Sequence, residues 1–134
     1  MSTNRGSGGR QPAEVLYPEL SYQIVGAAME VHNELGPGFL EAVYHTALAH
    51  ELTLRGVVFE SEKALPVRYK EQIVGHYEAD LVIDGKIIVE IKSMTALHPA
   101  HFAQAAHYLA ATGLKLALLI NFGANKLETK RIVK

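Results

Sequence analysis

The stretch Ile73–Lys92, IVGHYEADLVIDGKIIVEIK, decides the fold, because it places two apolar strands around a short turn. The turn contains Asp84-Gly85, a dipeptide typical of β-hairpins. The segments 81–83 and 87–89 on either side of it are apolar at consecutive positions. Strands without polar alternation are covered on both faces. This hairpin is therefore predicted to lie in the centre of a sheet.

Three of the charged residues in this hairpin are candidates for a site: Asp80, Glu90 and Lys92. Glu90 and Lys92 alternate along the second strand, so their side chains project from one face. The face that Asp80 occupies depends on the turn. A two-residue loop would point Asp80 away from Glu90, whereas a three-residue loop or a bulge would place both acids on one face. The alternative for Glu90 and Lys92 is a simple ion pair at a strand end.

Charged groups on a central apolar strand are costly to bury, so they need a partner, a metal or a cleft. Two converging carboxylates form the hard-oxygen site that Mg²⁺ or Mn²⁺ prefers. Such an ion polarises a phosphoryl oxygen and generates hydroxide. Lys92 would then hold the attacking water or offset negative charge in the transition state. The hairpin thus predicts a metal site, provided that the loop has the required length.

The rest of the chain predicts an α/β domain with a mixed sheet flanked by helices. Helical spacing of apolar residues begins after Ser21, a good N-cap residue, and Gly36-Pro37-Gly38 separates the first two helices. The predicted order is α-α-β-β-β-β-α-β-β over residues 14–134. The Gly- and Ser-rich residues 1–13 are predicted to be a disordered tail. The expected elements are helices over 21–35 and 40–55, strands over 57–60, 65–69, 73–83 and 86–92, a helix from Pro99 to Gly113, and strands over 116–122 and up to Val133.

Composition narrows the class of function. The formal net charge of −1 argues against a protein that binds nucleic acid over its whole surface. The absence of cysteine excludes disulfides, thiolate zinc sites and iron–sulfur clusters. The N-terminus lacks the apolar core of a signal peptide, and no stretch reaches the roughly 20 apolar residues of a membrane span. We expect a cytoplasmic protein without a membrane partner and, because a domain of 134 residues often gains stability by self-association, a homo-oligomer.

Several motifs resemble those of a known family. Asp80 followed by Glu90-x-Lys92 resembles the PD-(D/E)XK (restriction-endonuclease-like) nuclease superfamily, although Ala79 stands where that pattern has proline. Gly38-Phe-Leu-Glu41-Ala-Val-Tyr44 resembles the signature of its GxxExxY family. Gln104-Ala-Ala-His-Tyr108 is similar to the Gln-x-x-x-Tyr element of the RecB-like exonucleases. The likeness extends from Ser21 to Lys134.

The resemblance implies a Mg²⁺- or Mn²⁺-dependent phosphodiesterase that acts on DNA or RNA. It adds Glu41 as a third metal-side carboxylate, and it implies that Gln104 and Tyr108 line the site and contact substrate. The alternative for Glu41 is an acid favoured by the helix dipole. Tyr44 is either a substrate-side residue or a core aromatic, and the pair on the third helix is either a site wall or a polar seam.

Two histidines share a face with the expected site. His101 lies on the third helix with Gln104 and Tyr108, and His45 lies one turn after Glu41. Either is predicted to lie near substrate, and the alternative is a solvent-facing or hydrogen-bonded histidine.

Three classes of function therefore compete. The first is a metal-dependent nuclease built on Glu41, Asp80, Glu90 and Lys92. The second is a catalytically silent protein of the same fold that self-assembles or binds nucleic acid or another ligand. The third, a site for a small phosphorylated ligand, lacks the glycine-rich phosphate loop that would favour it.

Overall fold

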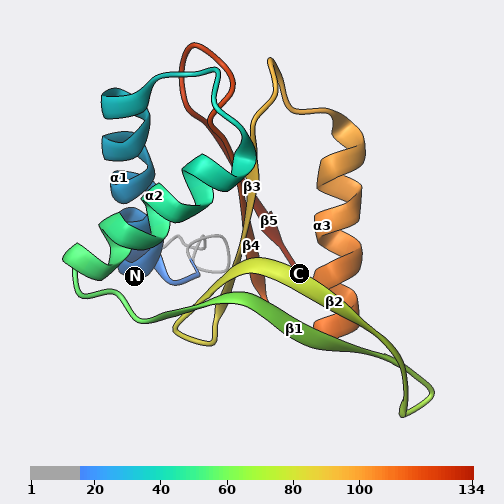
Figure 1. Ribbon diagram of the computed structural model, residues 1–134. Coiled ribbons are helices and arrows are strands. Elements are labelled where there is room, and N and C mark those ends of the chain that lie inside the picture. Colours follow the sequence, from blue (N-terminus) through green and yellow to red (C-terminus); the bar gives the residue numbers. More distant parts are fainter. Residues whose placement is uncertain (1–15) are drawn as a thin grey trace, which may run out of the picture.

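The computed structural model describes residues 16–134, so the tail predicted over residues 1–13 lies outside the described residues. A five-stranded mixed sheet forms the centre of the molecule, with helices α1 and α2 on one face and α3 on the other (Figure 1). The elements are α1 (Pro18–Leu35), α2 (Glu41–Leu54), β1 (Phe59–Tyr69), β2 (Gln72–Ile83), β3 (Ile87–Lys92), α3 (Pro99–Thr112), β4 (Leu116–Asn121) and β5 (Glu128–Val133).

The strands follow the chain order across the sheet, from β1 to β5. Only β3 and β4 are parallel, and the other neighbouring pairs are antiparallel. Parallel neighbours need a crossover connection, and α3 supplies it. The predicted α/β fold with a mixed sheet between helices is confirmed.

The apolar run of β3 is covered on both sides, as its sequence predicts. Ile87, Val89 and Ile91 pack into the core beneath α1 and α2. Ile88 belongs to a second core beneath α3, which includes Leu109. The face of β3 that carries Ile88 is therefore the face that α3 covers.

Two boundaries differ from the sequence prediction. The short strands expected over 57–60 and 65–69 are one strand, β1, because it pairs with β2 along its length, so the order is α-α-β-β-β-α-β-β. Helix α1 begins at Pro18, and Ser21 is not its cap. Proline suits the first turn of a helix, and Ser21 is buried one turn later, where its hydroxyl accepts a hydrogen bond from Arg131.

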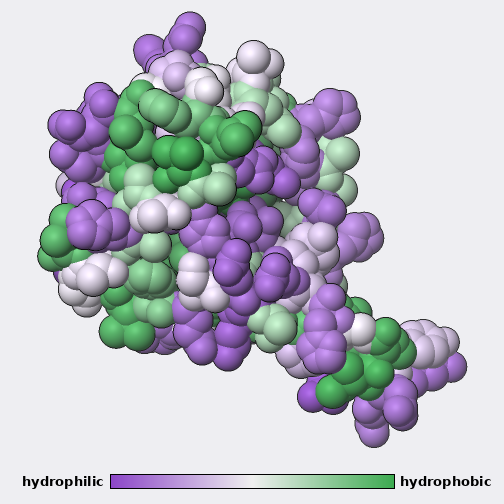
Figure 2. Space-filling model, in the orientation of Figure 1, coloured by the Kyte–Doolittle hydropathy of each residue, from purple (hydrophilic) through white to green (hydrophobic). Residues whose placement is uncertain are grey.

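The β1–β2 hairpin extends beyond the body of the molecule as an arm (Figure 1). The residues of its turn, Lys70 and Glu71, both have positive φ, at 50° and 70°. Tyr69, Ile73 and Val74 lie close to this turn and are exposed. Apolar surface is visible on the projecting arm in the space-filling view (Figure 2).

Candidate active site

The loop between β2 and β3 has the length that a shared acidic site requires. Leu81 pairs with Val89 and Ile83 with Ile87, which leaves three residues, 84–86, in the loop. Two of these, Asp84 and Gly85, have positive φ, at 53° and 66°. The pairing ends at Leu81 and Val89, and the same register continued by one residue would bring Asp80 level with Glu90. Of the loop lengths left open by the sequence, the structure has the three-residue loop that the metal hypothesis requires, and a shared face for the two acids remains a prediction.

Asp80 is fixed by the backbone of the neighbouring strand. Its Oδ2 accepts a hydrogen bond from the amide of Ile91 at 2.7 Å. This bond ties the carboxylate to β3 at the residue next to Glu90.

Glu90 lies on the α3 side of β3, because it follows Ile88 at the next alternate position. Its Oε2 is buried and has no hydrogen-bond partner. Burial raises the pKa of Glu90 to about 7, against the lowering effects of the Lys92 ammonium and the Asp80 backbone amide. The negative charge of Glu41 raises this pKa further. Glu90 is thus a carboxyl group with one unpartnered oxygen, and its pKa responds to the charges of both Lys92 and Glu41.

Glu41 is the first residue of α2, and hydrogen bonds hold the loop that precedes it. The Tyr44 hydroxyl donates to the carbonyl of Gly36 and accepts from the amide of Phe39. The Ser93 hydroxyl donates to the carbonyl of Phe39 at 2.6 Å. Since Ser93 directly follows Lys92, these bonds join the start of α2 to the end of β3. These bonds explain how Glu41, an exposed residue at the start of a helix, lies near enough for its charge to raise the pKa of Glu90.

Tyr44 lies in the core, which is one of the alternatives that the sequence left open. Its side chain is fully buried and stacks on Phe122, with ring centroids 4.7 Å apart. A side chain in this position does not reach the surface of the site. We infer that Tyr44 acts by holding the loop before Glu41 rather than by contact with substrate.

Asn121 is a functional candidate that the sequence analysis missed. Its side chain is fully buried at the end of β4, level with Lys92. Its amide accepts from the Met94 backbone N–H and donates to the Met94 carbonyl and to Glu128. Asn121 thus clamps the chain just after Lys92. The signal in the sequence is a single amide at the end of the otherwise apolar strand LALLIN.

Gly123 permits the close approach that this clamp needs. A Cβ at this position would collide with the backbone nitrogen and oxygen of Met94. We expect Gly123→Ala to lower the free energy of unfolding in urea by about 1–3 kcal/mol, because the loop would have to move. Gly75→Ala is the matched control, since nothing lies within 4 Å of a Cβ there. Equal stability of the two variants would contradict the close packing described.

Helix α3 brings an aromatic residue to the acidic site. The Tyr108 ring stacks on Tyr77 with centroids 3.5 Å apart and an interplanar angle of 17°. Burial raises the pKa of Tyr108, and the charge of Glu90 raises it further, so the two side chains are electrostatic neighbours. Gln104 lies one turn earlier on the helix and is exposed. Contact of Gln104 and Tyr108 with substrate remains a prediction.

The two candidate histidines make local hydrogen bonds. His101 Nδ1 accepts from the backbone amide of His98, and His98 Nδ1 accepts from that of Ala100, which together cap the start of α3. His45 Nε2 lies 2.7 Å from Ser61 Oγ. Both arrangements match the hydrogen-bonded alternative, and substrate contact by either residue remains a prediction.

The carboxylates suit a divalent cation in chemical type, because all of them supply hard oxygen ligands. The buried, unpartnered Oε2 of Glu90 supports this fit, since a cation would satisfy it. Within residues 16–134, no three histidine, aspartate or glutamate side chains are gathered closely enough to hold a metal as they stand. Binding of an ion would therefore involve movement of side chains such as the exposed Glu41.

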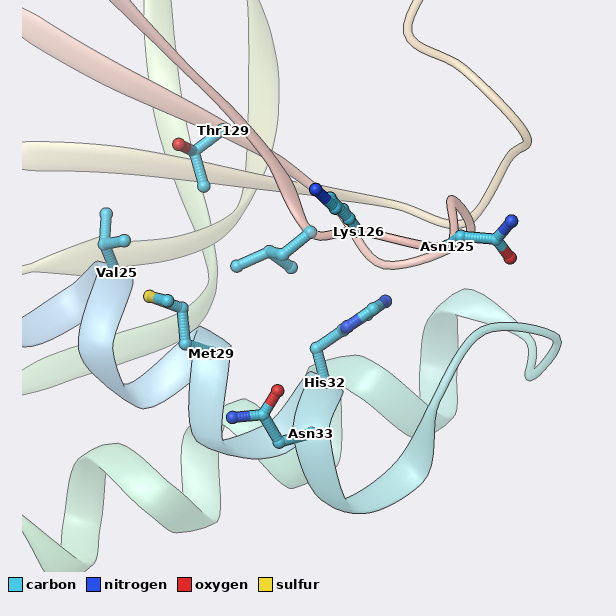
Figure 3. Close-up of a pocket in the computed structure, with 8 residues that line it drawn as sticks. Val25, Met29, His32, Asn33, Asn125, Lys126 and Thr129 are labelled. Carbon is cyan, nitrogen blue, oxygen red and sulfur yellow. The ribbon is translucent and has the colours of Figure 1, made fainter.

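The hollow between α1 and the loop before β5 is a separate feature (Figure 3). His32 lies at its base, where its Nε2 hydrogen-bonds to the Ala124 carbonyl and so ties α1 to the loop. The hollow contains none of the residues that form the candidate acidic site, Glu41, Asp80, Glu90 and Lys92. Its lining is formed by Val25, Met29, His32, Asn33, Asn125, Lys126, Leu127 and Thr129.

The fold and the acidic site together define a class. A mixed sheet with two acids and a lysine on neighbouring central strands, covered by helices on both faces, is the architecture of restriction-endonuclease-like nucleases. The family model of the PD-(D/E)XK nuclease superfamily matches residues 18–132. The chain belongs to this superfamily. The narrower likeness to the GxxExxY family remains a prediction.

One solved structure agrees with the fold, and a second shows a weaker likeness. The crystal structure of SSO0001 has a TM-score of 0.54 and 19% sequence identity, over 90% of this chain and 59% of that one. An alkaline exonuclease (LHK-Exo) from Laribacter hongkongensis has a TM-score of 0.46 and 14% identity, over 64% of this chain and 52% of that one. The chain thus spans between half and three fifths of the length of either protein.

No curated protein matches the sequence. Among the helices of residues 16–134, none combines the length and the apolar character needed to cross a membrane.

Proposed function

We propose that the protein is a nuclease that hydrolyses phosphodiester bonds of DNA or RNA with Mg²⁺ or Mn²⁺. The observation that carries the proposal is the buried, unpartnered oxygen of Glu90, which lies on the same strand face as Lys92 and next to Ile91, the residue whose amide bonds to Asp80. A carboxylate left in this state costs free energy unless a ligand satisfies it. Buried carboxylates whose pKa is raised in this way are typically found in functional sites.

Each residue has a distinct role in this proposal. Asp80 and Glu90 hold the ion, and Glu41 completes the ligand set from the start of α2. When bound, the ion supplies Lewis acidity and lowers the pKa of a coordinated water. Lys92 places a positive charge beside the phosphate, where negative charge develops in the transition state. Gln104 and Tyr108 bind the substrate from α3.

An activity assay with labelled oligonucleotides tests the proposal. Single-stranded, double-stranded and hairpin substrates of DNA and RNA should each be incubated with Mg²⁺, with Mn²⁺ and with EDTA. We expect cleavage of at least one substrate that depends on the ion and disappears in Asp80→Ala. Absence of cleavage in every combination, by folded protein, would contradict the proposal.

Tyr44→Phe tests the link between the core and Glu41. The variant keeps the ring on Phe122 but leaves the Phe39 amide and the Gly36 carbonyl without their partner. We expect a loss of about 1–3 kcal/mol in the free energy of unfolding, and a fall in cleavage rate of up to about 100-fold as Glu41 shifts. Tyr22→Phe, at an exposed site on α1, should leave both quantities unchanged. Cleavage by Tyr44→Phe at the wild-type rate would show that the loop does not position the site.

The second candidate function is a catalytically silent module that self-assembles. The exposed apolar residues near the tip of the β1–β2 arm favour it, because such a surface is typical of an interface. This candidate predicts a homo-oligomer of defined size whose assembly does not depend on metal. Light scattering with and without Mn²⁺, on wild type and on Ile73→Ser, separates it from the nuclease.

A further inference from the structure

Two buried side-chain atoms among residues 16–134 lack a hydrogen-bond partner: Glu90 Oε2 and the hydroxyl oxygen of Tyr77. Glu90 belongs to the acidic site, whereas Tyr77 belongs to none of the motifs described. An unsatisfied buried hydroxyl costs about 1–3 kcal/mol. Native proteins keep few of them, so each one calls for a physical explanation.

Tyr77 lies on the side of the sheet that Glu90 faces. It lies on β2 three residues before Asp80, and it packs against the core beneath α3. Its ring lies flat against Tyr108, with centroids 3.5 Å apart. Burial raises the pKa of Tyr108, and the negative charge of Glu90 adds to this rise. The stacked pair of Tyr77 and Tyr108 therefore lies on the same side of the sheet as Glu90.

Packing alone does not account for the hydroxyl. If Tyr77 served only as a core aromatic, the ring would suffice, and phenylalanine would fill the same space without burying an unpaired oxygen. The two unpartnered atoms also require different ligands. The hydroxyl is a hydrogen-bond donor that lacks an acceptor, whereas the Glu90 oxygen is an acceptor that lacks a cation or a donor.

We propose that Tyr77 is a further substrate-binding residue, whose hydroxyl donates a hydrogen bond to a phosphate oxygen of the nucleic-acid backbone. This inference rests on the proposed nuclease function. A phosphodiester group that arrives with a divalent cation satisfies both orphan atoms, because its oxygens accept from Tyr77 and the cation binds Glu90. The hydroxyl is buried in the free protein, so its contact with substrate would require a neighbouring side chain, such as the stacked Tyr108, to move.

Tyr77→Phe separates the hydroxyl from the ring, because it keeps the stack on Tyr108. Three quantities are measured: the free energy of unfolding in urea, the Kd for a fluorescent phosphorothioate oligonucleotide in Mn²⁺ by anisotropy, and the cleavage rate. We expect unfolding to be unchanged or more difficult, binding to weaken by about 5- to 20-fold, and cleavage to slow. Tyr69→Phe, at an exposed position on the same hairpin, is the matched control and should behave as wild type.

The outcomes distinguish the two levels of the proposal. Wild-type binding and cleavage by Tyr77→Phe would overturn the role of the hydroxyl and leave the nuclease function intact. A clear loss of stability in Tyr77→Phe would also overturn it, because the hydroxyl would then have a partner within the folded protein. Wild-type protein that neither binds nor cleaves the oligonucleotide would overturn the nuclease function, and the role of Tyr77 with it.

Discussion

Glu90→Gln should abolish cleavage and, at the same time, stabilise the metal-free protein. Glutamine is nearly isosteric but carries no charge, so the variant loses a metal ligand and the cost of burying an anion. Burial raises the pKa of Glu90 to about 7 from an ordinary value of 4.5. The folded protein therefore binds more protons than the unfolded chain between these two pH values, and its stability falls as pH rises through this window.

The size of the stability difference follows from the pKa shift of Glu90. Each pKa unit corresponds to about 1.4 kcal/mol, so the shift from 4.5 to about 7 means that ionised Glu90 costs at most about 3.5 kcal/mol above pH 7. In EDTA, urea unfolding should show little difference between wild type and Glu90→Gln at pH 4.5, and a more stable variant at pH 8. Glu78→Gln, on an exposed residue of β2, is the control for a change of net charge. Equal stabilities of wild type and Glu90→Gln at pH 8 would show that the burial of ionised Glu90 does not destabilise the folded protein.

Lys92→Ala should lower the cleavage rate by at least about 100- to 1,000-fold, the usual effect of removing one charge-stabilising group. Two physical causes act together. The phosphate loses a neighbouring positive charge, and Glu90 loses the ammonium that lowers its pKa, so its pKa rises further above 7. A part of the lost rate should therefore return as pH is raised from 7 to 9, because Glu90 then ionises.

Lys86→Ala is a demanding control for this prediction. Lys86 lies in the loop of the same hairpin, carries the same charge and is half exposed beside Asp84. Because it lies at the far end of β3 from Lys92, its loss should change the cleavage rate by less than twofold. A similar loss of rate in both variants would mean that general charge, not the position of Lys92, supports catalysis.

The sequence was sufficient to predict the central part of the fold. The apolar run on each side of Asp84-Gly85 identified the two covered strands, since few other structures accommodate such runs. It also limited Asp80 to two positions relative to Glu90. It could not choose between them, because Asp84-Gly85 can adopt the positive φ angles of a two-residue turn as well as those of a longer loop.

The sequence did not predict the contacts between segments that lie far apart in the chain. Asn121 is joined to Met94, and Ser93 to Phe39, across 27 and 54 residues respectively. Nothing local marks either bond. The same holds for Tyr77, whose position beside Tyr108 follows from how α3 crosses the sheet. The merged strand β1 has a similar cause, since pairing with β2 overrides the weak strand preference of residues 61–64.

The most direct test of the account is calorimetric titration of the metal-free protein with Mn²⁺ at pH 6 and at pH 8. If Asp80 and Glu90 hold the ion, wild type should bind Mn²⁺, and binding should tighten by roughly tenfold between these values as Glu90 ionises. Asp80→Asn and Glu90→Gln should bind at least tenfold more weakly at pH 8. Mn²⁺ binding that is absent from wild type, or that both variants retain in full, would contradict the assignment of these residues as a metal site.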